Sequence, residues 1–172
     1  MHFGTRFAKV YQLGYVTRDM DTALDYAKTQ LGLTRFDRFH SPAEVWADGK
    51  RQTLDIKIAL AFSGSRQIEI IEPVSGPIEL YTDAIDLDAQ ILTFHHVAIA
   101  IPGPFSEWQK LVAEVNESGD EMAIVCPPEP GPGDAFCLCY VDTRARLGHY
   151  VEYAWTNAAL KGKSTSDILR EN

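Results

Sequence analysis

Hydrophobic periodicity divides the first half of the chain into one strand, one helix and two further strands. Lys9–Thr17 (KVYQLGYVT) is dominated by β-branched, aromatic and other apolar residues, which favours a strand. Asp19–Leu31 has apolar residues at helical spacing, with Asp19 suited to cap its start and Gly32 suited to end it. A less regular stretch then leads to two strong strands, at Thr53–Phe62 and Gln67–Pro73.

The second half repeats the same order of elements. Phe94–Ile101 (FHHVAIAI) predicts an apolar strand, and Pro104 opens a helix with one apolar face. Three more strands are expected, at Met122–Cys126, Ala135–Val141 and His149–Trp155. With the less regular stretch of the first half counted as a strand, each half reads as strand–helix–strand–strand–strand, an α+β pattern with antiparallel sheet. Two such units would pack side by side and leave a cleft between curved sheets.

The repeat also sets boundaries within one predicted domain that spans residues 1–172. The first module covers about 8–75 and the second about 93–157. A linker at 76–92, with a short helix, joins them, and residues 158–172 form a polar tail. A chain of 172 residues is long enough to bury a core as one domain.

Composition and charge argue against several classes of protein. The hydrophobic share of 45% and the charged share of 23% are those of a globular chain. A net charge of -8 offers no basic field to hold nucleic acid or an anionic membrane. No apolar run approaches the roughly 20 residues that span a bilayer, and the start MHFGTRFAKV does not resemble a secretory signal.

The cysteines favour a reducing compartment. Cys126, Cys137 and Cys139 are an odd number and lack C-x-x-C spacing, so neither a disulfide framework nor a zinc site is indicated. Cys137 and Cys139 lie two apart on one face of a predicted strand, which suits small buried apolar residues. We therefore expect a cytoplasmic protein.

Polar residues inside the apolar strands are the candidates for chemistry, because a buried polar side chain needs a partner. Gln12 in the first strand corresponds to His96 in the matching strand of the second half. Glu69 in QIEII corresponds to Glu152 in HYVEY. The separations agree almost in register, with 57 positions from Gln12 to Glu69 and 56 from His96 to Glu152. The repeat therefore predicts that these four residues meet around one pocket.

Strand alternation gives this pocket a floor of small residues. Gln12 shares its strand face with Gly14, and His96 shares its face with Ala98 and Ala100. An amide oxygen, an imidazole and two carboxylates suit a divalent cation such as Zn, Ni, Co, Mn or Mg. The other reading is that the four polar residues pair with one another and have only a structural role.

Other polar residues near the four compete with them or have no counterpart in the repeat. Glu72 competes with Glu69 but lies on the opposite strand face, and His95 competes with His96. His40 and His149 have no partner in the other half and are interpreted as structural or surface residues.

The order of these motifs resembles the vicinal oxygen chelate superfamily, which includes glyoxalases, bleomycin-resistance proteins and dioxygenases. YQLGYVTRDMDTAL resembles the opening strand and helix of that superfamily, and FHHVAIAI resembles the start of its second module. QIEIIEPVSG and YVDTRARLGHYVEY are similar to its two module-ending strands. The resemblance covers roughly residues 8–157 and is nearest to the glyoxalase I and methylmalonyl-CoA epimerase branch.

That resemblance implies a pair of βαβββ modules forming a cupped sheet around one divalent metal, with no organic cofactor. The metal ligands it implies are Gln12, Glu69, His96 and Glu152. It also implies an isomerase, epimerase or lyase that removes a proton beside a metal-chelated carbonyl of a small substrate. Glu152, with Glu69 as its symmetric partner, is the expected base.

The identity of the substrate does not follow from the sequence. Tyr150 and Trp46 are candidates to line the pocket. No arginine or lysine stands at a spacing that identifies a phosphate or coenzyme A pocket. A homodimer is one assembly that the resemblance implies, since paired modules in the superfamily close within one chain or across two. The alternative function is a non-catalytic protein that sequesters a small molecule, as in the bleomycin-resistance branch.

Overall fold

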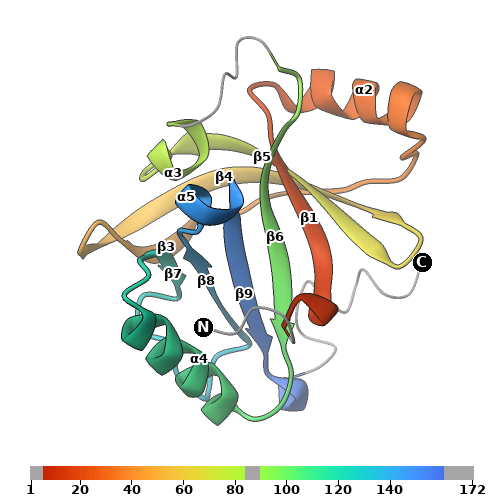
Figure 1. Ribbon diagram of the computed structural model, residues 1–172. Helices are drawn as coiled ribbons and strands as arrows, with labels where there is room; N and C mark the ends of the chain where they lie inside the picture. The colour runs from red at the N-terminus through yellow and green to blue at the C-terminus, as the bar shows by residue number, and fades with distance from the viewer. Residues whose placement is uncertain (1–5, 84–89, 161–172) are drawn as a thin grey trace.

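The computed structural model describes residues 6–83 and 90–160, and both halves contain the predicted order of elements (Figure 1). The first half contains η1 (Phe7–Lys9), β1 (Val10–Val16), α2 (Met20–Leu31), β2 (Asp37–His40), β3 (Ala43–Ala47), β4 (Lys50–Ser63), β5 (Arg66–Ser75) and α3 (Glu79–Thr82). The second half contains β6 (Thr93–Ile101), α4 (Phe105–Ser118), β7 (Met122–Cys126), β8 (Phe136–Val141), α5 (Arg144–Leu147), β9 (Tyr150–Thr156) and η2 (Ala158–Leu160).

The strands form one mixed, strongly curved sheet, which confirms the predicted architecture. Its order is β2-β4-β3-β7-β8-β9-β6-β1-β5, and β4 also pairs with β5. The two modules meet along β1 and β6, which are antiparallel, and again where β3 pairs with β7 at two positions. Within each module the first strand is parallel to the last, as β1 with β5 and β6 with β9. The sheet therefore curls around an enclosed centre to which both modules contribute.

The less regular stretch of the first half consists of two short strands, β2 and β3. Both lie antiparallel along β4, one after the other. β2 has no fully buried residue, and β3 buries only Val45 and Ala47. Their hydrophobic pattern was too short and too polar to predict them individually, because the long neighbour β4 supplies most of the apolar contact.

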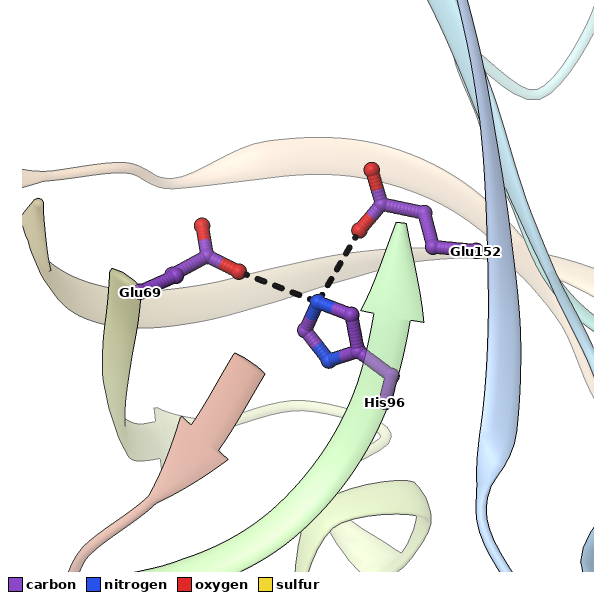
Figure 2. Close-up of side chains that lie close together, drawn as sticks. All are labelled: Glu69, His96 and Glu152. Atoms are coloured by element: carbon purple, nitrogen blue, oxygen red, sulfur yellow. Dashed lines mark ion pairs between the residues drawn. The ribbon is translucent and has the colours of Figure 1, made fainter. Parts of the chain in front are cut away.

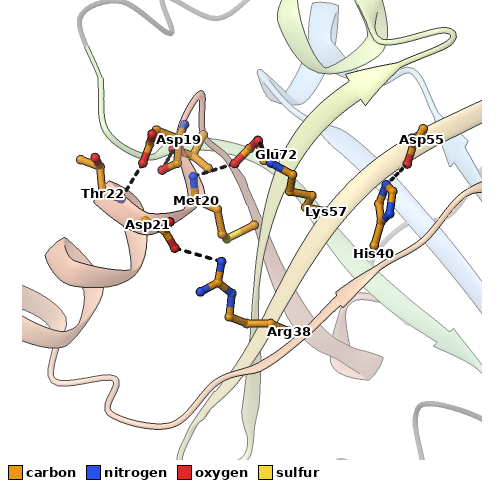
Figure 3. A network of polar contacts seen from close by, with 10 residues as sticks. Asp19, Met20, Asp21, Thr22, Arg38, His40, Asp55, Lys57 and Glu72 are labelled. Atoms are coloured by element: carbon orange, nitrogen blue, oxygen red, sulfur yellow. Dashed lines mark hydrogen bonds and ion pairs between the residues drawn. The ribbon is translucent and has the colours of Figure 1, made fainter.

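Helix α2 begins and ends where its caps predict. The Asp19 carboxylate accepts a hydrogen bond from the Thr22 amide, and Gly32 adopts the left-handed conformation with φ 71°. Glu72 on β5 accepts from the Met20 amide at 2.8 Å and also from Lys57 on β4 (Figure 3). Glu72 thus fastens the start of α2 to the sheet and does not compete with Glu69.

Helix α4 covers the outer face of the second module (Figure 1). Its buried residues Trp108, Leu111 and Val115 pack in one cluster with Val97 and Ile99 of β6. The same cluster contains two of the three free cysteines, Cys137 and Cys139, each fully buried as predicted. Because β6 turns its large aliphatic side chains outward, its small and polar residues face the enclosed centre.

The linker and the tail are only partly within the described chain. The predicted short linker helix is α3, while residues 84–89 and 161–172 lie outside the described residues. None of the helices in the described part of the chain is long and apolar enough to cross a membrane.

Candidate metal centre

Four neighbouring strands, β5, β1, β6 and β9, place the predicted site residues on one face of the sheet. Glu69 lies opposite Gly14 of β1, and Gly14 lies opposite His96 of β6. Two residues along the strands, Gln12 lies opposite Ala98, which in turn lies opposite Glu152 of β9. Residues that are paired across neighbouring strands point to the same face, so all four side chains converge. The site closes within one chain.

Gly14 leaves the space that the His96 ring occupies. A Cβ atom at Gly14 would lie 1.9 Å from Cε1 and 2.2 Å from Nδ1 of His96. Real Cβ atoms do not approach other atoms so closely, so the imidazole rests directly on the backbone of β1. The small residue predicted as a pocket floor is therefore needed to admit the histidine.

The imidazole and the two carboxylates form a compact buried cluster (Figure 2). His96 Nε2 lies 3.3 Å from Glu69 Oε2 and 3.4 Å from Glu152 Oε2. The exposed fraction is 0% for His96, 8% for Glu69 and 5% for Glu152. Gln12, which is 4% exposed, lines the same cavity as both glutamates. The structure thus brings together all four of the predicted residues.

Three acceptor atoms of this cluster have no hydrogen-bond partner among the described residues. They are Gln12 Oε1, Glu69 Oε2 and His96 Nε2. The Gln12 amide is oriented by Gln67, whose Oε1 accepts from Gln12 Nε2 at 2.7 Å. Because the amide nitrogen is used in this way, the oxygen is left free. Unpartnered buried acceptors are costly, and a group of them in one place is the arrangement expected of a cation site.

A chain of hydrogen bonds fixes the tautomer of His96. The Leu80 carbonyl lies 3.0 Å from His95 Nε2, and His95 Nδ1 lies 3.0 Å from His96 Nδ1. Burial, followed by the neighbouring His96, lowers the pKa of His95 to about 3, so His95 is neutral. A carbonyl can only accept, so His95 donates from Nε2 and accepts at Nδ1 from His96. His96 therefore carries its proton on Nδ1, and Nε2 faces the carboxylates as an acceptor.

An irregularity in β6 makes this chain of contacts possible. The pairing with β1 shifts between Gly14, which lies opposite His96, and Tyr15, which lies opposite Phe94. His95 is thus an extra residue of the kind found in a β-bulge. Strict alternation would send His95 and His96 to opposite faces, and the shift lets their Nδ1 atoms meet.

These residues fit a divalent metal ion. Two ligand atoms that each lie about 2.1 Å from one ion are roughly 3.0–3.4 Å apart at tetrahedral or octahedral angles. The separations of Nε2 from the two carboxylate oxygens, 3.3 and 3.4 Å, fall in this range. Two carboxylates would balance the charge of a divalent ion. The donor set of imidazole nitrogen and oxygen suits several such ions and does not select one.

The two glutamates differ in their supports. Tyr140 on β8 forms a hydrogen bond with Glu152, whereas Glu69 Oε2 has no such partner. Burial, and then the negative charge of Glu69, raises the pKa of Glu152, while His96 and the Tyr140 hydroxyl oppose this rise. Burial also raises the pKa of Tyr140 well above its usual range, so Tyr140 stays a hydrogen-bond donor.

A cavity of about 250 Å³ opens from this cluster. Its polar end is formed by Gln12, Gln67, Glu69 and Glu152. Most of the remaining wall is aliphatic or aromatic, with the alternating residues of β4 as its main part. The cavity gives a small molecule direct access to the converging acceptor atoms.

Two further residues singled out in the sequence lie outside this cavity. Trp46 is 43% exposed and points away from it, since its neighbour Val45 on β3 supplies the lining side chain. Tyr150 packs against His95, with ring centroids 4.9 Å apart, so it supports the histidine chain. His40 and His149 contact Asp55 and the Tyr150 carbonyl, in keeping with structural or surface roles.

Gln67, His95 and Tyr140 were not predicted as site residues. Gln67 stands two positions before Glu69 and was an available signal, because two polar residues then share one strand face. The sequence presents His95 only as a competitor of His96, and Tyr140 reads as an ordinary aromatic residue in a strand. The roles of His95 and Tyr140 are identified only by their contacts in the folded protein.

A fold of two such modules with this buried cluster is that of the vicinal oxygen chelate class. Residues 11–137 match the family model of the Glyoxalase/Bleomycin resistance protein/Dioxygenase superfamily. The chain belongs to this superfamily, which confirms the resemblance inferred from its motifs. No curated protein matches the chain significantly by sequence.

Solved structures with the same fold have low sequence identity to the chain. A hypothetical protein, BH1468 from Bacillus halodurans, is 21% identical with a TM-score of 0.53, covering 86% of this chain and 94% of its own. Methylmalonyl-CoA epimerase from Mycobacterium tuberculosis is 16% identical with a TM-score of 0.54, covering 90% and 91%. A methylmalonyl-CoA epimerase in complex with methylmalonyl-CoA and NH4+ is 15% identical with a TM-score of 0.52, covering 87% and 95%. At these identities the likeness shows the fold alone.

Proposed function

We propose that the protein is a metal-dependent isomerase, epimerase or lyase that moves a proton next to a carbonyl of a small substrate. The observation that carries the proposal is the convergence of Gln12 Oε1, Glu69 Oε2 and His96 Nε2, which are buried and without hydrogen-bond partners. A divalent ion held there would polarise a substrate carbonyl and stabilise the negative charge that develops beside it.

The protein's own residues divide the work of binding and proton transfer. Gln12 and His96 are the fixed ligands, because Gln67 and His95 hold their side chains in place. Glu152 is the proposed base, since its raised pKa brings it toward the range in which a carboxylate both takes and returns a proton. Glu69 faces the same space and is the second candidate for proton transfer.

Proton exchange in deuterium oxide tests this proposal without requiring the natural substrate. The zinc-loaded protein would be incubated with a panel of α-hydroxyketones, hemithioacetals and acyl thioesters, and exchange beside the carbonyl followed by NMR. Glu152→Gln is expected to slow exchange at least about 100-fold. Glu44→Gln is the matched control, because Glu44 lies on the exposed face of β3. Exchange that persists unchanged in Glu152→Gln would exclude Glu152 as the base.

A second candidate function follows from the apolar cavity, which by itself suits a protein that binds a small molecule without changing it. The two functions differ in what the carboxylates do. If Glu69→Gln together with Glu152→Gln leaves ligand binding intact and no compound in the panel is turned over, the binding function is favoured.

A further inference from the structure

The wall of the cavity is mainly apolar, whereas the end beside the buried cluster is polar. Beyond the four polar residues at one end, successive inward positions of β4 are Leu54, Ile56, Ile58 and Leu60. Ile71 of β5 and Ile124 of β7 continue this surface on either side. Alternation along β4 thus presents four aliphatic side chains in a row to whatever occupies the cavity.

Positive charge is missing from the same wall. Among the described residues that line the cavity, none is lysine, arginine or histidine. The charged lining residues are Glu69 and Glu152, whose charge a divalent ion would balance. A carboxylate or phosphate placed beyond the ion would therefore have no cationic side chain as a partner, and a charge buried in this way is disfavoured.

We infer that the substrate carries an uncharged aliphatic or aromatic body attached to its pair of metal-binding oxygens. This inference rests on the proposed function and specifies the substrate class of the same site. The apolar body lies along the inward face of β4 while the two oxygens reach the acceptor cluster. A substrate that carries a further charged group, beyond the two metal-binding oxygens, does not fit this wall.

Three hydroxamic acids separate the contributions of the metal and of the wall. Acetohydroxamic acid has a chelating head without a chain, and hexanohydroxamic acid adds an apolar chain. Adipic acid monohydroxamate has nearly the same length and ends in a carboxylate. Each would be titrated calorimetrically into the protein with and without Zn²⁺. Every methylene group that is fully buried contributes about fourfold in affinity. Hexanohydroxamic acid has four more methylene groups than acetohydroxamic acid, so it is expected to bind up to about 250-fold more tightly. The terminal carboxylate is expected to weaken binding at least about tenfold.

The variant Leu54→Ala removes part of the wall and is expected to weaken hexanohydroxamic acid several-fold while leaving acetohydroxamic acid unchanged. Leu24→Ala is the matched control, because Leu24 on α2 is similarly buried but packs in a separate cluster between α2 and the sheet. If Leu54→Ala does not fold, the affinities of the three acids for the wild-type protein still test whether the wall favours an apolar chain.

The outcomes distinguish this inference from the proposed function. The inference is overturned if the chain adds no affinity, or if the adipic compound binds as well as hexanohydroxamic acid, while zinc-dependent binding of the head group persists. Chain-length dependence that is the same without zinc supports the apolar wall and contradicts the metal-dependent function. If none of the acids binds, both are overturned.

Discussion

The two modules supply matching halves of the site but hold them by different means. In the first module, Gln12 is oriented by Gln67 from the neighbouring strand β5. In the second, His96 is oriented by His95, the residue before it, which an irregularity in β6 turns to the same side. Both devices satisfy one polar atom of the ligand side chain and leave the other free to face the centre.

The carboxylates show the same asymmetry. Glu152 of the second module has a hydrogen bond with Tyr140, while Glu69 Oε2 of the first has no such partner. The site residues of the second module are therefore held by more contacts: a chain that begins at Leu80 of α3 and runs through both histidines, and a hydrogen bond with Tyr140. The difference teaches that the repeat preserves the positions of the site residues, whereas the residues that orient them differ between the two halves.

Gly14 of the first module contacts His96 of the second, so one substitution at Gly14 is expected to disrupt the site most. Gly14→Ala places a methyl group into the His96 ring, so the imidazole or the strand must move. We expect a loss of about 1–3 kcal/mol in the free energy of unfolding, measured in urea. Zinc affinity is expected to fall by more than about 100-fold, because the displaced ligand no longer meets the two carboxylates.

Gly133→Ala is the matched control for this variant, since a Cβ there meets nothing within 4 Å. An alanine at position 14 that leaves both zinc affinity and stability at the wild-type values would show that the ring does not rest on the β1 backbone.

Replacing His95 or Gln67, which orient His96 and Gln12, is expected to reduce zinc affinity by different amounts. His95→Phe keeps a ring but removes the acceptor for His96 Nδ1, and we expect zinc affinity to fall about 10–100-fold. Gln67→Leu releases the Gln12 amide, whose oxygen can still turn toward the ion, so a smaller loss is expected. Isothermal titration with Zn²⁺ measures both. A loss in Gln67→Leu that equals or exceeds that in His95→Phe contradicts the proposed asymmetry.

The dependence of metal binding on pH is the most gradual of the expected effects. Burial raises the pKa of Glu152, so the folded, metal-free protein keeps this proton to a higher pH than the unfolded chain. Ionisation of Glu152 alone thus weakens the metal-free fold as the pH rises from about 4.5 through the raised pKa. A metal ion binds the ionised form, so its apparent affinity rises by up to about tenfold per pH unit across this window.

The rise in melting temperature on adding zinc is therefore expected to grow from pH 5 toward neutral pH, measured by thermal unfolding in matched buffers. A zinc-dependent rise that stays constant over this range would argue that Glu152 is ionised before the metal binds.

The sequence predicted that the four site residues lie together because strand alternation and an internal repeat are both regular. The 57 and 56 residue separations placed Gln12 with Glu69 and His96 with Glu152 before any contact was known. The strands β2 and β3 and the role of His95 could not be predicted in this way. β2 and β3 are short and depend on β4 for their packing, and the shift in β6 breaks the alternation on which the prediction relied.

Metal binding to the purified protein tests the central claim most directly. The protein would be stripped with a chelator, dialysed against micromolar Zn²⁺ and analysed for bound metal, with the melting temperature recorded alongside. We predict one ion per chain, a higher melting temperature with the ion, and loss of both effects in His96→Ala. If the wild-type protein binds no ion and its melting temperature does not respond, then Glu69, His96 and Glu152 pair only with one another and the account is contradicted.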